Sequence, residues 1–140
     1  MITFVLRRIL FIFGTRPEAI KLCPVVLHMR RHPDQFDARV CVTGQHREML
    51  DQVLAAFDVD SDHDLDVMRP GQTLFQSTAR ILAGLEEVFE AETPDMVLVR
   101  GGYDHDAVRG AGSETRDACV LRRRGCGGQR TVDSRHAGSA

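Results

Sequence analysis

The feature that most constrains the fold is an apolar run that ends at a glycine and leads into a helix start. Residues 9–13 are all large and apolar, and Gly14 follows them. Such a run is typical of a strand that is buried on both faces in a parallel sheet. Pro17 suits the first turn of a helix, because that turn leaves its backbone N–H groups unpaired and proline has none. The sequence therefore predicts a strand, a tight turn at Gly14 and a helix.

Arg16 and Lys21 lie at the start of this predicted helix. A helix N-terminus favours anions, because it presents unpaired N–H groups and a partial positive charge. Arginine adds a planar fork of donors and lysine adds a point charge. We predict that both residues bind a phosphate or diphosphate; the competing interpretation is a pair of ordinary surface cations. Glu18 is interpreted as a favourable charge for the helix dipole rather than as a base.

Strands and helices alternate along the first hundred residues. Short apolar runs predict further strands at residues 39–43 and 96–99, with a shorter edge strand at 65–68. Such alternation predicts an α/β fold with a parallel sheet and right-handed crossovers. In sheets of this kind, ligands bind beyond the carboxyl ends of the strands. The turn at Gly14 and the turn at Gly44 are expected at that edge.

Two more helices are predicted between these strands. Apolar side chains at helical spacing indicate one helix at residues 47–57 and a longer one at about 73–91. The Thr93-Pro94 pair ends the longer helix. Its buried stripe is expected to consist of Leu74, Thr78, Ile81, Leu82, Leu85, Val88 and Phe89.

Residues 101–140 differ in character from the rest of the chain. They are rich in glycine and arginine, contain no phenylalanine or proline, and hold few large aliphatic side chains. A segment of this composition buries too little apolar surface to offset its chain entropy. We therefore predict a partial Rossmann-like domain over residues 1–100 and an aberrant, disordered tail over residues 101–140. The sheet is then truncated after the strand at 96–99.

Charge and composition exclude several classes of function. The net charge is −2, which gives no basic surface for nucleic acid or for a membrane. The cysteines at positions 23, 41, 119 and 126 fit no zinc pattern, so no metal site is predicted. No apolar run is long enough to cross a bilayer, and the first residues lack the long apolar stretch of a signal peptide. We therefore expect a cytoplasmic chain.

Four segments, in order, resemble the non-hydrolysing UDP-N-acetylglucosamine 2-epimerases. They are Phe-Gly-Thr-Arg-Pro-Glu-Ala-Ile-Lys at 13–21, Val-Thr-Gly-Gln-His-Arg-Glu-Met-Leu-Asp at 42–51, Gly-Gln-Thr-Leu at 71–74 and Pro-Asp-Met-Val-Leu-Val at 94–99. The resemblance implies the Rossmann-like N-terminal half of a two-domain GT-B-type fold. It also implies an isomerase that interconverts UDP-GlcNAc and UDP-ManNAc by eliminating and re-adding UDP. The family uses no cofactor, usually forms homodimers and serves polysaccharide biosynthesis.

The resemblance also implies roles for individual residues. Arg16 and Lys21 match family positions that contact the nucleotide sugar. Gln45 and Gln72 match positions that form a second, activating UDP-GlcNAc site in bacterial members. His46 stands beside Gln45 and is interpreted as a polar loop residue rather than a catalytic one.

The chain departs from the family after residue 100. The family places Gly-Asp and a threonine-rich loop after the fourth strand, where this chain has Gly-Gly-Tyr-Asp-His-Asp at 101–106. Without that aspartate and the family's later glutamates, no catalytic residue is assigned and the chain alone is expected to be inactive. The codons of 103–106, read one base later, can encode the family's threonines, so we hypothesise a single-base frame slip near Arg100. Sequencing the DNA across codons 98 to 112 tests this.

Two alternatives stay open at this stage. The first is a non-catalytic fragment that binds a nucleotide sugar or a partner protein. The second is a relative of the GT-B glycosyltransferases, although the Gly-Gln-His-Arg-Glu-Met run at 44–49 argues against it. Titration with UDP-GlcNAc separates a binding fragment from one that has lost the site.

Overall fold

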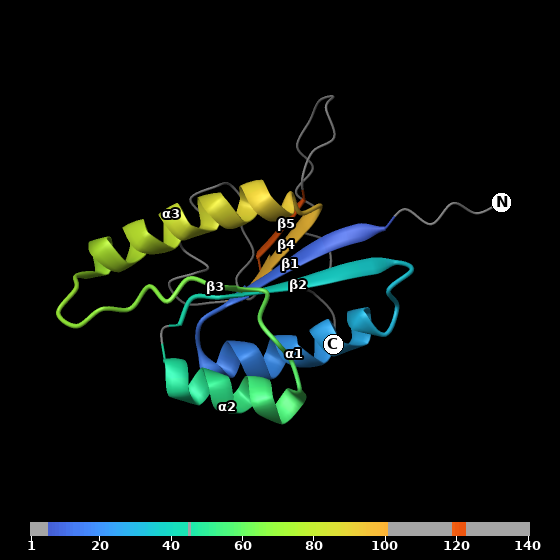
Figure 1. Cartoon of the computed structure of the whole chain (residues 1–140), viewed down its shortest axis with the longest axis horizontal. Helices are drawn as coiled ribbons and strands as arrows, with labels where there is room; N and C mark the ends of the chain where they lie inside the picture. Colours follow the sequence, from blue (N-terminus) through green and yellow to red (C-terminus); the bar gives the residue numbers. More distant parts are fainter. Residues whose placement is uncertain (1–5, 45, 101–118, 123–140) are drawn as a thin grey trace, which may run out of the picture.

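The computed structural model describes residues 6–44, 46–100 and 119–122. One sheet runs through the molecule in the order β3-β2-β1-β4-β5, with α1 and α2 on one face and α3 on the other (Figure 1). The pairings of β1 with β2, β1 with β4 and β2 with β3 are all parallel, which confirms the α/β fold class. The elements are β1 (Arg7–Phe13), α1 (Arg16–Arg30), β2 (Phe36–Val42), α2 (Arg47–Phe57), β3 (His63–Asp64), α3 (Leu74–Glu92), β4 (Met96–Val99) and β5 (Cys119–Arg122).

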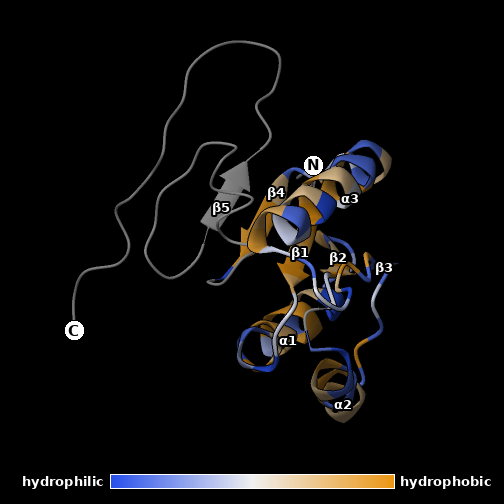
Figure 2. Ribbon diagram, turned by 90° about the vertical axis from the view of Figure 1, so that its left-hand side faces the viewer, coloured by the Kyte–Doolittle hydropathy of each residue, from blue (hydrophilic) through white to orange (hydrophobic). Residues whose placement is uncertain are grey.

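The central strand β1 supplies both halves of the core. Phe11 and Phe13 pack with α1 and α2, whereas Leu10 and Ile12 pack with α3, and all four side chains are fully buried. This alternation follows from the two-residue period of a strand, and it explains why the run is apolar without interruption. The orange colouring of the strands between the helix layers shows the same arrangement (Figure 2).

The helix boundaries agree closely with those predicted. α2 spans the predicted residues, and α3 begins directly after Thr73. Thr73 and Gln76 form a capping box, in which Gln76 N donates to Thr73 Oγ1 at 3.2 Å and Thr73 N donates to Gln76 Oε1 at 2.9 Å. α3 ends where Thr93 takes a left-handed conformation, with φ of 42°.

The predicted buried stripe of α3 is only partly correct. Ile81, Leu85 and Val88 are buried, as expected, whereas Leu74 and Leu82 are 55% and 48% exposed. The sheet is short, so α3 contacts it with its middle and its carboxyl-terminal half, and the first turn extends beyond it (Figure 1).

The edges of the sheet also differ from the prediction. The edge strand expected at residues 65–68 is wrong: β3 comes two residues earlier, because Asp66 has φ of 43° and interrupts the extended backbone. β5 pairs with β4 in the antiparallel direction, which the sequence did not predict. Apart from β5, the expectation of a disordered tail over residues 101–140 lies outside the described residues.

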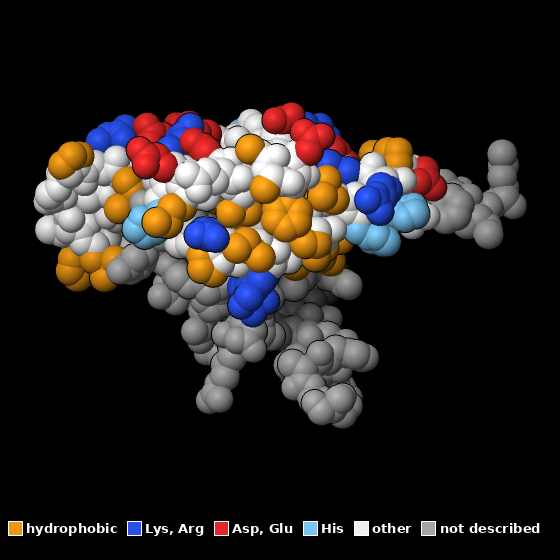
Figure 3. Space-filling model, turned by 90° about the horizontal axis from the view of Figure 1, so that it is seen from below, with side chains coloured by type: hydrophobic (Ala, Val, Ile, Leu, Met, Phe, Trp, Pro, Cys, Tyr) orange, Lys and Arg blue, Asp and Glu red, His pale blue; other side chains and the backbone are white. Residues whose placement is uncertain are grey.

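The outer face of α1 and α2 carries apolar side chains. Figure 3 shows them gathered in the middle of this face, with charged groups mostly around them. Ile20 and Val25 on α1 and Met49 on α2 are 43%, 38% and 54% exposed. Both helices therefore contribute apolar surface on the side away from the sheet.

Charged residues at the amino ends of the strands form a separate cluster. Arg8 Nε donates to Asp37 Oδ2 at 2.8 Å, and Arg39 Nε donates to Asp37 Oδ1 at 3.0 Å. Burial alone would raise the pKa of Asp37, but these two hydrogen bonds and the charges of both arginines hold that pKa below its ordinary value of 3.8. The folded state therefore favours the ionised carboxylate.

The lowered pKa of Asp37 makes the free energy of unfolding depend on pH. Because the folded-state pKa of Asp37 is depressed, its contribution is present above the ordinary pKa and is lost as the pH falls through the folded-state value. We expect Asp37→Asn to lower the free energy of unfolding at neutral pH, and this difference from the wild type to shrink below pH 3.8. Urea denaturation of both proteins, at neutral pH and below pH 3.8, measures this difference. The exposed Asp34→Asn is the matched control, and an equal difference at both pH values would contradict the prediction.

Candidate functional site

Three successive hydrogen bonds join the carboxyl ends of the strands. Thr43 N donates to the Phe13 carbonyl at 3.2 Å, and Val67 N donates to the Thr43 carbonyl at 3.1 Å. Gln72 Nε2 then donates to the Val67 carbonyl at 3.2 Å. These bonds bring Gln72, which lies 59 positions after Phe13 in the sequence, to the same edge of the sheet as the turn that opens α1. This is the edge at which open parallel sheets bind ligands.

The turn after β1 is closed by a glutamate from the first turn of α1. Glu18 Oε2 accepts hydrogen bonds from Gly14 N at 3.0 Å and from Thr15 N at 3.1 Å. Glu18 is only 7% exposed, so its carboxylate is directed into the turn rather than into solvent. The structure thus gives Glu18 a role in helix capping, in agreement with its interpretation as a charge at the helix start.

Arg16 and Lys21 are exposed at the start of α1. Neither side chain forms an ion pair or hydrogen bond with another residue of the described ranges. Five positions of a helix separate them by roughly 140° around its axis and by about 7.5 Å along it. The two cations therefore leave α1 in different directions.

Gln72 forms hydrogen bonds at one end of its side chain only. Its amide nitrogen donates to the Val67 carbonyl and lies 3.4 Å from Met68 Sδ. Its Oε1 is buried and has no hydrogen-bond donor among the described residues. A buried acceptor without a donor is an exception in folded proteins, because the hydrogen bond that it made to water is not replaced. Gln45, the other glutamine singled out in the sequence, lies outside the described residues.

Arg47 is already engaged by carboxylates, which the sequence alone did not reveal. Its guanidinium pairs with Asp64 of β3, with Asp51 at 3.4 Å and with Asp66 at 3.8 Å. The charge of Asp64 is the main cause that raises the pKa of Arg47 above its ordinary value. Arg47 therefore ties α2 to β3, while the neighbouring His46 is exposed at the N-cap of α2. The signals in the sequence were the i,i+4 spacing of Arg47 and Asp51 on the predicted helix and the acidic stretch at residues 58–66.

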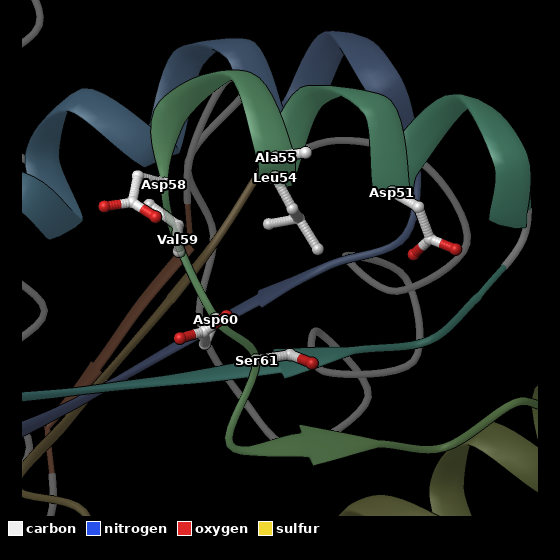
Figure 4. A pocket seen from close by; sticks show the side chains of 7 residues that line it. All are labelled: Asp51, Leu54, Ala55, Asp58, Val59, Asp60 and Ser61. Atoms are coloured by element: carbon white, nitrogen blue, oxygen red, sulfur yellow. The ribbon is translucent and has the colours of Figure 1, made fainter.

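An open pocket at the carboxyl end of α2 is acidic and does not suit an anionic ligand. Its lining comprises Asp51, Leu54, Ala55, Asp58, Val59, Asp60 and Ser61 (Figure 4). A helix carboxyl end carries partial negative charge, which adds to that of the three aspartates and repels phosphate. Within the described ranges, no three His, Cys, Asp or Glu side chains are grouped to hold a metal ion. No helix in those ranges has the length and apolar character needed to cross a membrane.

Comparison with known proteins gives a consistent result. The sequence model of the family described as UDP-N-acetylglucosamine 2-epimerase matches residues 28–107. A UDP-N-acetylglucosamine 2-epimerase from Yersinia pestis is 57% identical over 94 residues, which cover 67% of this chain and 25% of that protein. Its counterpart from Escherichia coli K12 is 53% identical over the same shares. The chain thus spans about a quarter of the length of the curated relatives that it matches.

Solved structures agree with the sequence matches. The Neisseria meningitidis UDP-GlcNAc 2-epimerase bound to UDP-GlcNAc superimposes with a TM-score of 0.69 at 46% identity, covering 74% of this chain and 28% of that one. The Staphylococcus aureus MnaA–UDP structure gives a TM-score of 0.67 at 44% identity, covering 72% of this chain and 26% of that one. The fold described above is therefore found within much longer chains.

Proposed function

We propose a function for this chain from the premise that it belongs to the UDP-N-acetylglucosamine 2-epimerase family, whose sequence model matches more than half of it. The activity that we infer from the family is the interconversion of UDP-GlcNAc and UDP-ManNAc, an isomerase reaction that eliminates and re-adds UDP. This chain carries one wall of the site, in which Arg16 and Lys21 bind the diphosphate of the nucleotide sugar. We further propose a cytoplasmic location, a homodimer for the full-length relatives and a second UDP-GlcNAc site that includes Gln45 and Gln72.

The observation that carries this proposal is the pair of uncommitted cations at the start of α1. Arg16 and Lys21 are exposed and have no carboxylate partner among the described residues, whereas Arg47 nearby is paired with three. A diphosphate joined to a sugar and a nucleoside is long enough to contact both. Relatives that were crystallised with UDP-GlcNAc or UDP support the same class of ligand.

Binding of the nucleotide sugar and its conversion need different residues. Proton transfer at a sugar carbon needs a positioned base and a partner acid, and no residue of this chain is assigned either role. We therefore propose that the chain by itself binds UDP-GlcNAc without converting it. Release of UDP-ManNAc by the purified chain would contradict the second half of that statement and leave the first intact.

Calorimetric titration of the full chain with UDP tests the binding. We expect Arg16→Ala to weaken UDP binding by about tenfold, the loss that follows from removing one charge-assisted contact. Arg31→Ala is the matched control, because Arg31 is another exposed arginine at the opposite end of α1. Equal affinity in the wild type, Arg16→Ala and Arg31→Ala would refute the assigned role of Arg16.

A further inference from the structure

Glu18 places a buried negative charge where an anionic ligand would be expected to bind. In many strand–turn–helix sites, the backbone N–H groups of the turn and of the helix start donate to a phosphate. Here the N–H groups of Gly14 and Thr15 both donate to Glu18 Oε2, at 3.0 and 3.1 Å. The carboxylate therefore occupies the position that a phosphate oxygen takes in such sites.

Two neighbouring positions of this turn offer a ligand no free backbone N–H group. Pro17 has no N–H, and Ala19 N donates to the Thr15 carbonyl at 3.1 Å. Glu18 itself is 7% exposed, so solvent competes little for its hydrogen bonds. A phosphate that approached these amides would have to displace the carboxylate and would meet its negative charge before doing so.

We propose that Glu18 is an internal anion that closes the turn and assigns ligand binding to side chains instead of backbone amides. The diphosphate then binds to Arg16 and Lys21, outside the turn, and this part rests on the proposed function. A diphosphate offers two charged groups, one for each cation, whereas inorganic phosphate offers one. Glu18 is thus a positioning and specificity-determining residue.

Replacing the carboxylate tests this directly, with inorganic phosphate and UDP as probes on the full chain. We expect the wild type to bind phosphate weakly, and Glu18→Ala to bind it at least about tenfold more tightly. NMR amide shifts of Gly14 and Thr15 should then respond to phosphate in this variant. Glu18→Gln is the matched control: its amide oxygen can accept the same two hydrogen bonds although the charge is lost, so phosphate binding should rise less than in Glu18→Ala.

Each outcome bears on the proposal. A folded Glu18→Ala variant without increased phosphate affinity overturns it, and so does a Glu18→Gln variant that binds phosphate as tightly as Glu18→Ala. If Glu18→Ala does not fold, hydrogen exchange in the wild type decides: slow exchange at the Gly14 and Thr15 amides, unchanged by UDP, supports closure, and fast exchange overturns it.

The UDP titration keeps the two proposals distinguishable. If the wild type does not bind UDP but Glu18→Ala gains phosphate binding, the proposed function fails and the closed turn stands. If the wild type binds UDP and the Gly14 and Thr15 amides lose their protection in the complex, the function stands and the closed turn fails.

Discussion

Replacement of Phe11 by alanine is expected to lower the free energy of unfolding by about 3–5 kcal/mol. Phe11 lies in the middle of β1, the central strand, and its side chain is fully buried between the sheet and the layer of α1 and α2. The substitution removes a large apolar side chain from water-excluded contacts and leaves a cavity that the packed surroundings fill only in part. A loss of this size is a large fraction of the total stability of a small domain, which is about 5–15 kcal/mol.

A second phenylalanine provides the control. Phe75, in the first turn of α3, is 86% exposed, so Phe75→Ala should change the free energy of unfolding by less than about 0.5 kcal/mol. Urea denaturation of both variants, followed by circular dichroism, makes the comparison. Similar losses at Phe11 and Phe75 would show that the core is not centred on β1.

Replacement of Glu92 by alanine is expected to give the next largest loss, about 2 kcal/mol. Glu92, the last residue of α3, is 8% exposed, and its Oε1 lies 2.6 Å from His63 Nε2. Its Oε2 lies 3.5 Å from Arg8 and 3.8 Å from Arg39. Removal of the carboxylate leaves the two arginines close together, but both are partly solvated and both keep Asp37 as a partner, which limits the loss.

The matched control for this substitution lies on the same helix. Glu87 is exposed and forms no ion pair with any of the described residues, so Glu87→Ala should change the free energy of unfolding by less than about 0.5 kcal/mol. Glu92→Gln should recover part of the loss, because an amide oxygen still accepts a hydrogen bond from His63 or an arginine. Equal losses in Glu87→Ala and Glu92→Ala would contradict the role of the buried carboxylate.

The elements that the sequence predicted well are those whose pattern is local. α2 and β4 have the predicted boundaries, because helical spacing and a short β-branched run are both visible within a few residues. The edge strand was misplaced because Asp66 adopts a positive φ, which its neighbours do not indicate. β5 pairs across a long sequence separation and in the antiparallel direction, and a local pattern cannot reveal either property.

The candidate site was predictable to a similar extent. The position of Arg16 at a helix start followed from the glycine and proline around it, and the structure has a helix that begins there. The Thr-x-x-Glu spacing of Thr15 and Glu18 is typical of a capping box and signals the hydrogen bond to Thr15 N, but the second one, to Gly14 N, has no such signal. Glu92 is one of four glutamates in the second half of α3, and only the packing of the helix on the sheet distinguishes it from the exposed ones.

β5 has a consequence for how the chain can be handled in the laboratory. On its outer side, β4 presents a row of backbone hydrogen-bond donors and acceptors. When such a row is unpaired, an extended segment of another copy can pair with it, and repeated pairing builds a filament. The return of Cys119–Arg122 fills this row, with Val99 opposite Cys119 and Met96 opposite Arg122. Trimming the chain before residue 119 would therefore leave this row of β4 open to pairing with another copy.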